Sequence, residues 1–203
     1  MENLGPSNDT IPADEFRTAA AIARTERANA AFRALNPARK RVAIAKDVLR
    51  WLATGKLRPG YGYLDIPEFY DNQRDIVNGG TCEACAVGSL FACAVERGDA
   101  GGTVRRSPTS CRLIGEDATE IHRKLAGIFE PDQLALIEAA FETECRLPIA
   151  TIQAVLGYEI DRQHPKAQEY FRKAWDFCPR ADRPERMVLI MENIIANKGT
   201  FIP

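Results

Sequence analysis

The stretch NGGTCEACAVGSLFACAVERG, residues 78–98, decides the fold, because small residues follow one side of it and large apolar residues the others. At helical spacing, the small side consists of Cys82, Cys85, Ser89 and Cys93. The large apolar side chains are those of Val87, Leu90, Phe91 and Val95. A helix that is apolar nearly all round belongs at the centre of a bundle, and reduced cysteine is among the most buried residue types. The stretch therefore predicts a buried central helix with Thr81 as its N-cap.

The spacing Cys82-x-x-Cys85 also supports a second interpretation, a thiol-reactive or metal-binding site centred on these two cysteines. In the first turn of a helix, unbonded N–H groups and the helix dipole lower the pKa of a thiol. A zinc site commonly takes its four ligands from two pairs, and the sequence has no second Cys-x-x-Cys and no spaced histidine pair. Core packing is therefore the first interpretation, and Cys82 at the helix start stays a candidate low-pKa thiol.

The other chemistry-bearing residues are scattered along the chain. His122 is expected at the surface or boundary of an amphipathic helix, and His164, directly before Pro165, at a helix entry. Glu142 and Glu144 are expected on a solvated face. The sequence contains no G-x-S-x-G, phosphate-cradling or dinucleotide-binding motif, which favours a non-enzymatic protein without a cofactor.

Helical patterns extend on both sides of the central stretch. The segment after Asn36-Pro37 has apolar residues at three- and four-residue steps and a stop signal at Gly55. Near the C-terminus, Asp182 and Glu185 have capping-box spacing before another apolar face. Further helices are expected over residues 116–126, 131–142, 149–156 and 163–177. Residues 57–66 are expected to form a short strand or an ordered aromatic loop.

These patterns predict a mainly α fold, a single-domain helical bundle formed by residues 37–203. Residues 1–36 precede it as a polar flexible arm followed by an alanine-rich helix from about residue 13. That helix has few large apolar side chains, so it is expected to lean on the body or on another protomer, which makes a homo-oligomer one expectation.

Composition narrows the class of protein. The chain has 203 residues, 45% of them hydrophobic, which is enough for one domain with a core. Its 27 basic and 28 acidic residues give a formal charge of -1, which argues against a nucleic-acid partner. No apolar run approaches the roughly 20 residues of a membrane span, and no secretory signal is apparent. The six cysteines are therefore expected as reduced thiols in a cytoplasm.

Aromatic and arginine side chains in irregular segments are the best candidates for binding, because such residues are favoured at recognition sites. The candidates are Tyr61, Tyr63, Phe69, Tyr70, Arg74, Arg105 and Arg106. The alternative is that these aromatic side chains simply anchor their loop to the core.

Three blocks of the sequence resemble uncharacterised small proteins carried by phages and prophages. They are the RVAIAKDVL block from Arg41 with Gly60-Tyr-Gly-Tyr63, the C-x-x-C-A-x-G block from Cys82, and the tail MENIIANKGTFIP that ends at Pro203. The resemblance implies a viral or mobile-element accessory protein in the cytoplasm of a bacterial host cell, and it assigns no site residues.

Taken with the missing catalytic motifs, this context favours a non-enzymatic protein that binds a host protein or a small nucleotide-like signalling ligand. Such binding would counter a bacterial defence or another host process. The alternative is a cysteine-dependent protein, metal-binding or thiol-reactive, centred on Cys82 and Cys85.

Overall fold

The computed structural model describes residues 13–60, 82–97, 118–142, 152–153, 158–161, 163–175, 177 and 181–203. Within these ranges the fold is mainly helical, with seven helices and a two-stranded sheet. The elements in chain order are α1 (Ala13–Arg33), α2 (Pro37–Ala53), β1 (Leu57–Pro59), β2 (Cys82–Ala84), α4 (Ala86–Glu96), α5 (Ala118–Leu125), α6 (Pro131–Phe141), α8 (Pro165–Trp175) and α9 (Arg183–Ala196). The mainly α fold class is confirmed.

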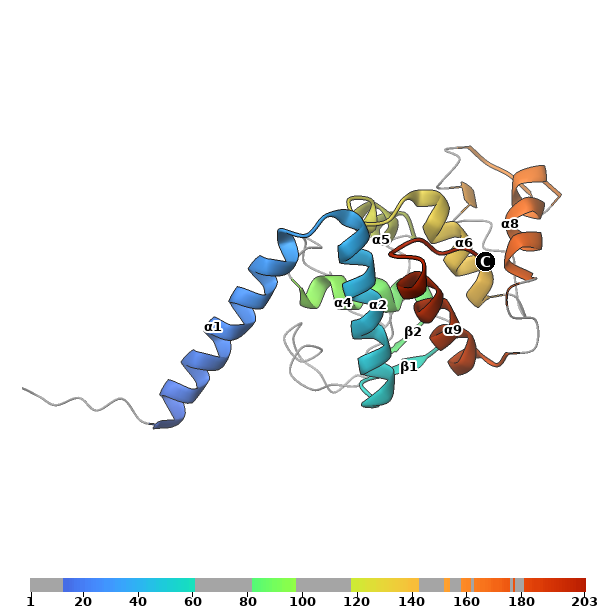
Figure 1. Cartoon of the computed structure of the whole chain (residues 1–203). Coiled ribbons are helices and arrows are strands. Elements are labelled where there is room, and N and C mark those ends of the chain that lie inside the picture. The colour runs from blue at the N-terminus through green and yellow to red at the C-terminus, as the bar shows by residue number, and fades with distance from the viewer. Residues whose placement is uncertain are drawn as a thin grey trace, which may run out of the picture.

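Helix α4 lies at the centre of the fold, as the sequence predicts. Its residues from Ala86 to Ala94 are all buried. Helix α4 packs against α2, α5 and α6, and in Figure 1 it runs behind α2. Because α4 has no polar face over this length, each neighbouring helix has to turn an apolar face toward it.

The segment that leads into α4 differs from the prediction. Residues 82–84 are not the first turn of the helix; they form β2, which pairs in parallel with β1 so that Leu57 lies opposite Cys82. The backbone N–H of Cys82 donates to the carbonyl oxygen of Lys56 at 2.9 Å. The strand is missed because three residues are too short to show a two-residue alternation, and their small side chains also fit a helical stripe.

The N-cap of α4 is Cys85 and not Thr81. Its backbone is extended, and its Sγ accepts a hydrogen bond from the N–H of Gly88 at 3.4 Å, the role that a serine or aspartate oxygen usually fills. One turn later, the hydroxyl of Ser89 donates to the carbonyl oxygen of Cys85 at 2.8 Å. Helix α4 therefore begins four residues later than the sequence pattern indicates.

Helix α2 has the predicted start and stop. The side chain of Asn36 accepts from the N–H of Arg39, and Pro37 occupies the first turn, where its missing N–H costs nothing. Gly55 follows the helix at a φ of 70°, a backbone conformation that glycine adopts readily. This tight ending places β1 directly after α2.

Helix α9 is closed at both ends by local hydrogen bonds. The side chain of Asp182 accepts from the N–H of Glu185, as the capping-box spacing predicts. At the other end, the N–H of Gly199 donates to the carbonyl of Ile194 at 2.7 Å, and that of Lys198 to Ile195 at 3.2 Å, the two bonds of a Schellman motif. The chain therefore turns back sharply against α2 after α9.

A single arginine ties three distant segments together on one side of the core. Arg41 of α2 donates from Nε to the carbonyl oxygen of Gly199 at 2.5 Å and from Nη1 to that of Ile128 at 2.6 Å. These two carbonyls belong to the turn after α9 and the turn before α6. Helices α2 and α9 lie side by side in Figure 1, and this arginine holds their ends in register.

The last residues of the chain dock onto the body. Phe201 is buried, and its N–H donates to Oε1 of Gln133 at 2.6 Å. The side chain of Asn193 bonds both backbone groups of Ile202, accepting from its N–H and donating to its carbonyl oxygen. A side-chain amide thus imitates the pairing of a neighbouring strand.

Helix α1 projects from the body (Figure 1), and its described side chains touch the rest of the protein only near its C-terminal end. Phe32 is the buried anchor there. Of the helix expected over residues 149–156, only residues 152 and 153 are described, and both are helical. The loop expected after residue 98 lies outside the described residues.

Replacing Gly199 by alanine should lower the free energy of unfolding by at least about 1 kcal/mol, because its φ is 99° and a methyl group there would overlap the carbonyl oxygen of Ala38. Urea denaturation of the full chain measures the effect. Gly127 is the matched control, because a methyl group there would meet nothing within 4 Å. Equal effects at the two positions would contradict the packing of the turn after α9 against α2.

Candidate functional site

The aromatic and arginine residues singled out in the sequence are not among those that the structure describes. Tyr61, Tyr63, Phe69 and Tyr70, together with Arg74, Arg105 and Arg106, all lie outside the described residues. Their role in binding stays a prediction. The described part of the chain offers three other features: the thiols beside β2 and α4, an interior cluster of charged groups, and an aromatic surface on α8.

The three described thiols are buried. Cys82 and Cys85 are each 2% exposed, and Cys93, on the opposite end of α4, is 0% exposed. Cys82 lies in β2 with its Sγ 3.6 Å from the carbonyl oxygen of Lys56, and Cys85 caps α4. The interpretation of these cysteines as small core residues is confirmed, although the helical stripe proposed for them starts only at Cys85.

Burial raises the pKa of every one of these thiols. The pKa of Cys82 rises to about 11 because loss of water outweighs the nearby charge of Lys56. That of Cys85 rises much further, because burial is reinforced by the carboxylates of Glu138 and Glu142. The expectation that Cys82 could be a low-pKa thiol is therefore wrong: it is in a strand, not at a helix start, so no helix dipole opposes desolvation.

Metal ligation centred on Cys82 and Cys85 gains no further ligands from the described residues. Over the ranges that the structure describes, no three His, Cys, Asp or Glu side chains gather in a way that could hold a metal ion.

An interior cluster of charged groups lies between α5, α6 and the start of α9. His122 and Glu138 are each 8% exposed, and Nε2 of His122 lies 3.6 Å from Oε2 of Glu138. His122 is thus part of the interior and not at the surface or boundary, because the carboxylate of α6 gives its ring a polar neighbour.

Arg186 is the cation of this cluster and is 1% exposed. Its Nη1 donates to the carbonyl oxygen of Phe141 at 2.7 Å, and its Nη2 to that of Ala181 at 2.7 Å. The buried guanidinium therefore supplies donors to two carbonyls at helix ends, that of the last residue of α6 and that of the residue before the N-cap of α9. Arg186 thus joins the end of α6 to the start of α9.

Glu142, directly after α6, completes the cluster. The pKa of Glu142 is raised to about 7, chiefly by burial; Arg183 opposes the rise, the carboxylate of Glu138 adds to it, and Arg186 opposes it more weakly. Glu142 was expected on a solvated face; it is instead partly buried, because α6 ends against α9. A carboxyl group with this pKa exchanges its proton near neutral pH.

The aromatic surface lies on the outside of the fold, along α8. His164, Gln168, Phe171 and Trp175 follow one another at steps of four, three and four residues, which places them on one face of the helix. Trp175 is 47% exposed, and its ring centroid lies 5.4 Å from that of Phe171. Tyr158, 53% exposed, packs edge-on against the ring of His164 with centroids 5.7 Å apart. We call Tyr158, His164, Gln168, Phe171 and Trp175 the aromatic stripe.

The aromatic stripe is held in place by the way α8 begins. Nδ1 of His164 accepts the N–H of Lys166 at 3.2 Å, which confirms His164 as a helix-entry residue. The helix itself is held by its buried face, formed by Ala167, Tyr170 and Ala174, which packs on α6. The hydroxyl of Tyr170 donates to Asp132 of α6 at 2.5 Å and fixes this packing.

A different face of α8 is charged. Glu169 lies between Lys166 and Lys173, with Nζ–carboxylate distances of 3.1 and 2.8 Å. These two hydrogen-bonded lysines lower the pKa of Glu169 to about 2. Helix α8 thus has a buried face, the aromatic stripe and a charged face. The aromatic stripe and the charged face can therefore be changed separately on the same helix.

Sequence reasoning missed the aromatic stripe although its signal is present. The spacing of His164, Phe171 and Trp175 is helical, but spacing alone does not show whether this face is buried or exposed, so the sequence of residues 163–177 predicts a helix and no binding surface. Tyr158 could not have been added, because its contact with His164 depends on how the chain enters α8.

Comparison of the chain with protein-family models, with curated proteins and with solved structures found no match. Within the described residues, none of the helices has the length and apolar character needed to cross a membrane.

In the native protein, Cys82, Cys85 and Cys93 should resist alkylation by iodoacetamide at mildly alkaline pH, because all three are buried thiols with raised pKa values. Peptide mapping by mass spectrometry measures each site separately. The same protein unfolded in denaturant is the control and should be labelled at all three. Rapid labelling of Cys82 in the folded protein would contradict its burial.

Replacing Glu142 by glutamine should flatten the pH dependence of stability. Because the pKa of Glu142 is raised in the folded state, its contribution is complete below the ordinary carboxyl pKa of 4.5 and is lost as pH rises through about 7. Urea denaturation between about pH 5 and pH 8 measures this slope. Glu169→Gln is the control and should leave it unchanged, because the pKa of Glu169, about 2, lies below this range. An unchanged slope in the Glu142 variant would refute the raised pKa.

Proposed function

We propose that this chain is a non-enzymatic accessory protein that binds a protein of a bacterial host cell and thereby counters a host process. The observation that carries the proposal is the aromatic stripe on α8. Tyr158 and Trp175 are two of the few large apolar side chains in the described residues that are exposed. Tyrosine and tryptophan dominate the binding energy of protein interfaces, because each combines a large apolar area with a polar group.

The scaffold behind the stripe favours recognition of a protein surface. Helix α8 is pinned to α6 by its buried face and by the bond from Tyr170 to Asp132, so a partner would not have to order it. The stripe runs along a convex helix and not in a closed cavity, a shape that suits a groove or flat surface on another protein. Binding there would act by occlusion or sequestration of the partner.

The resemblance to phage- and prophage-borne proteins supplies the context, which is the cytoplasm of a bacterial cell and a role against a host defence or another host process. The cysteine-dependent alternative is opposed by the raised pKa values of Cys82 and Cys85, since catalysis and ligation both need the thiolate. A small nucleotide-like ligand stays the other class of partner and is distinguished by the experiment below.

The test begins with the full chain as bait in a lysate of the bacterial host, followed by purification of the recovered protein and calorimetric titration. Combined Tyr158→Ser and Trp175→Ser should weaken this binding about 100-fold or more, because both would be central anchors. The matched control, Lys166→Ser with Lys173→Ser, changes the charged face of the same helix and should leave the affinity within a few-fold of the original.

Two outcomes would contradict the proposal. If the aromatic variant, still helical by circular dichroism, binds the purified partner as well as the original, α8 is not the interface. If no protein binds, but native mass spectrometry shows a small molecule retained from a cell extract, the partner class is the small ligand.

A further inference from the structure

Charge is distributed unevenly along the chain. Residues 21–60 contain ten basic side chains and only two acidic ones, Glu26 and Asp47, whereas the whole chain has 27 basic and 28 acidic residues. Acids therefore outnumber bases in the rest of the protein. A net charge near zero argues against a nucleic-acid partner only when the two signs are mixed over the surface, so the position of these basic side chains in the fold decides the question.

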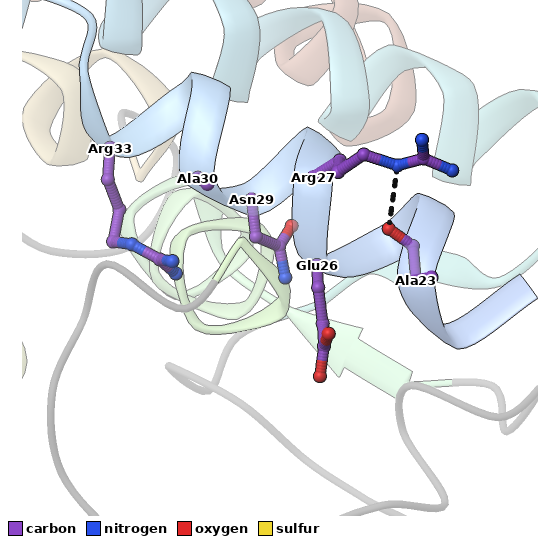
Figure 2. Close-up of a pocket in the computed structure, with 6 residues that line it drawn as sticks. All are labelled: Ala23, Glu26, Arg27, Asn29, Ala30 and Arg33. Carbon is purple, nitrogen blue, oxygen red and sulfur yellow. Dashed lines mark hydrogen bonds between the residues drawn. The ribbon is translucent and has the colours of Figure 1, made fainter. Parts of the chain in front are cut away.

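The basic side chains of α1 are mixed with other polar groups. Figure 2 shows Glu26, Asn29 and Arg33 pointing to one side of the helix, where they help to line a shallow hollow. Arg27 lies back along the helix and donates from Nε to the carbonyl oxygen of Ala23 at 3.1 Å. Because an acid lies among the bases, this side of α1 is not a purely basic face.

Helix α2 has a solvent-facing row of basic side chains. Arg39, Lys46 and Arg50 are seven and four residues apart, which places them on one helical face, and all three are exposed. The row extends about 16 Å along the helix at the usual rise per residue. The only acid of α2, Asp47, is buried and accepts two bonds from Arg97. We call Arg39, Lys46 and Arg50 the basic row.

Carboxylates of the protein neutralise little of the charge on the basic row. Within the described residues, neither Arg39 nor Lys46 forms an ion pair. Arg50 lies 3.0 Å from Oδ1 of Asp47, but its side chain is 57% exposed. The exposed Lys198 adds a further cation beside the start of the row, because the glycine that follows it packs against the first turn of α2. The basic row is therefore a concentration of positive charge that repels itself.

We infer that the basic row binds the phosphodiester backbone of a double-stranded nucleic acid without reading its sequence. The phosphates of a duplex are a dense, regular line of negative charge, and arginine and lysine are the side chains that most often contact them. A straight helix with its cations on one outward face can lie against such a line without rearrangement. This surface is separate from the aromatic stripe on α8, so the inference goes beyond the proposed function.

The chemistry of the basic row favours a duplex over other anionic partners. Protein interfaces and membrane surfaces both take apolar anchors beside the charges, and α2 has no exposed large apolar side chain. A single strand would gain affinity from bases stacked on aromatic side chains, and the only aromatic residue of α2, Trp51, is buried. A duplex presents its phosphates outward and needs neither feature.

Fluorescence anisotropy of the full chain with a fluorescein-labelled DNA duplex of about 20 base pairs tests the inference. Three phosphate contacts predict that the affinity falls about 40-fold between about 50 and about 200 mM salt. Arg39→Ser combined with Lys46→Ser should weaken binding about tenfold or more at the lower salt. The same variant should show only about a fourfold fall over this salt range, because one contact remains.

The matched control is Lys166→Ser with Lys173→Ser, which removes the same amount of charge from α8 and should leave the duplex affinity within a few-fold of the original. Tyr158→Ser with Trp175→Ser should also bind the duplex as the original does. This second control makes failure of the inference distinguishable from failure of the proposed function. Circular dichroism confirms that each variant keeps its helices.

An RNA duplex, a single strand of the same length and vesicles of anionic phospholipid are titrated in parallel. Binding of either duplex supports the inference, since both present the same backbone chemistry. The inference is overturned if neither duplex binds at about 50 mM salt, if the α2 and α8 variants lose affinity equally, or if the single strand binds more tightly than the duplexes. Binding to the vesicles without binding to a duplex would assign the basic row to a membrane surface instead.

Discussion

Helix α4 has no side over residues 86–94 that can face water, and the surrounding architecture depends on this constraint. A helix of this kind has to be enclosed, so α2, α5 and α6 each present an apolar face to it. The enclosure leaves α8 and α9 in a second layer, packed on α6 and α2. It also explains the position of the thiols, because cysteine and alanine let the enclosing elements approach α4 closely.

The central helix, the caps of α2 and α9 and the mainly α fold could be predicted, since each rests on local patterns that are several turns long. The start of α4 could not. Residues 82–84 become a strand only because β1 offers them backbone partners. This pairing joins segments that are far apart in the sequence, so the local pattern of three residues does not show it. The interior charged cluster was less predictable still: the raised pKa of Glu142 and the burial of His122 both depend on which helices meet at the end of α6.

Polar groups inside the protein serve mainly to join elements. Arg41 and Arg186 each donate to two main-chain carbonyls from different segments, and Asp47, 3% exposed, accepts two bonds from Arg97 at 2.7 and 2.9 Å. A guanidinium suits this role because its several donors are fixed in one plane and it stays charged when partly buried. Arg41 and Arg186 supply hydrogen bonds to backbone carbonyls in turns and at helix ends, where no regular helical bonding continues.

The bond between Arg41 and Gly199 joins residues 158 positions apart in the sequence. Helices α2 and α9, which pack against each other, are likewise far apart in the chain. During synthesis, α2 leaves the ribosome long before α9 exists, so one side of its apolar face has no native neighbour for most of translation. Contacts between distant segments also carry a large cost of loop closure. Completion of the core is therefore a late event that awaits α9, and until then the face of α2 that α9 covers has no native partner.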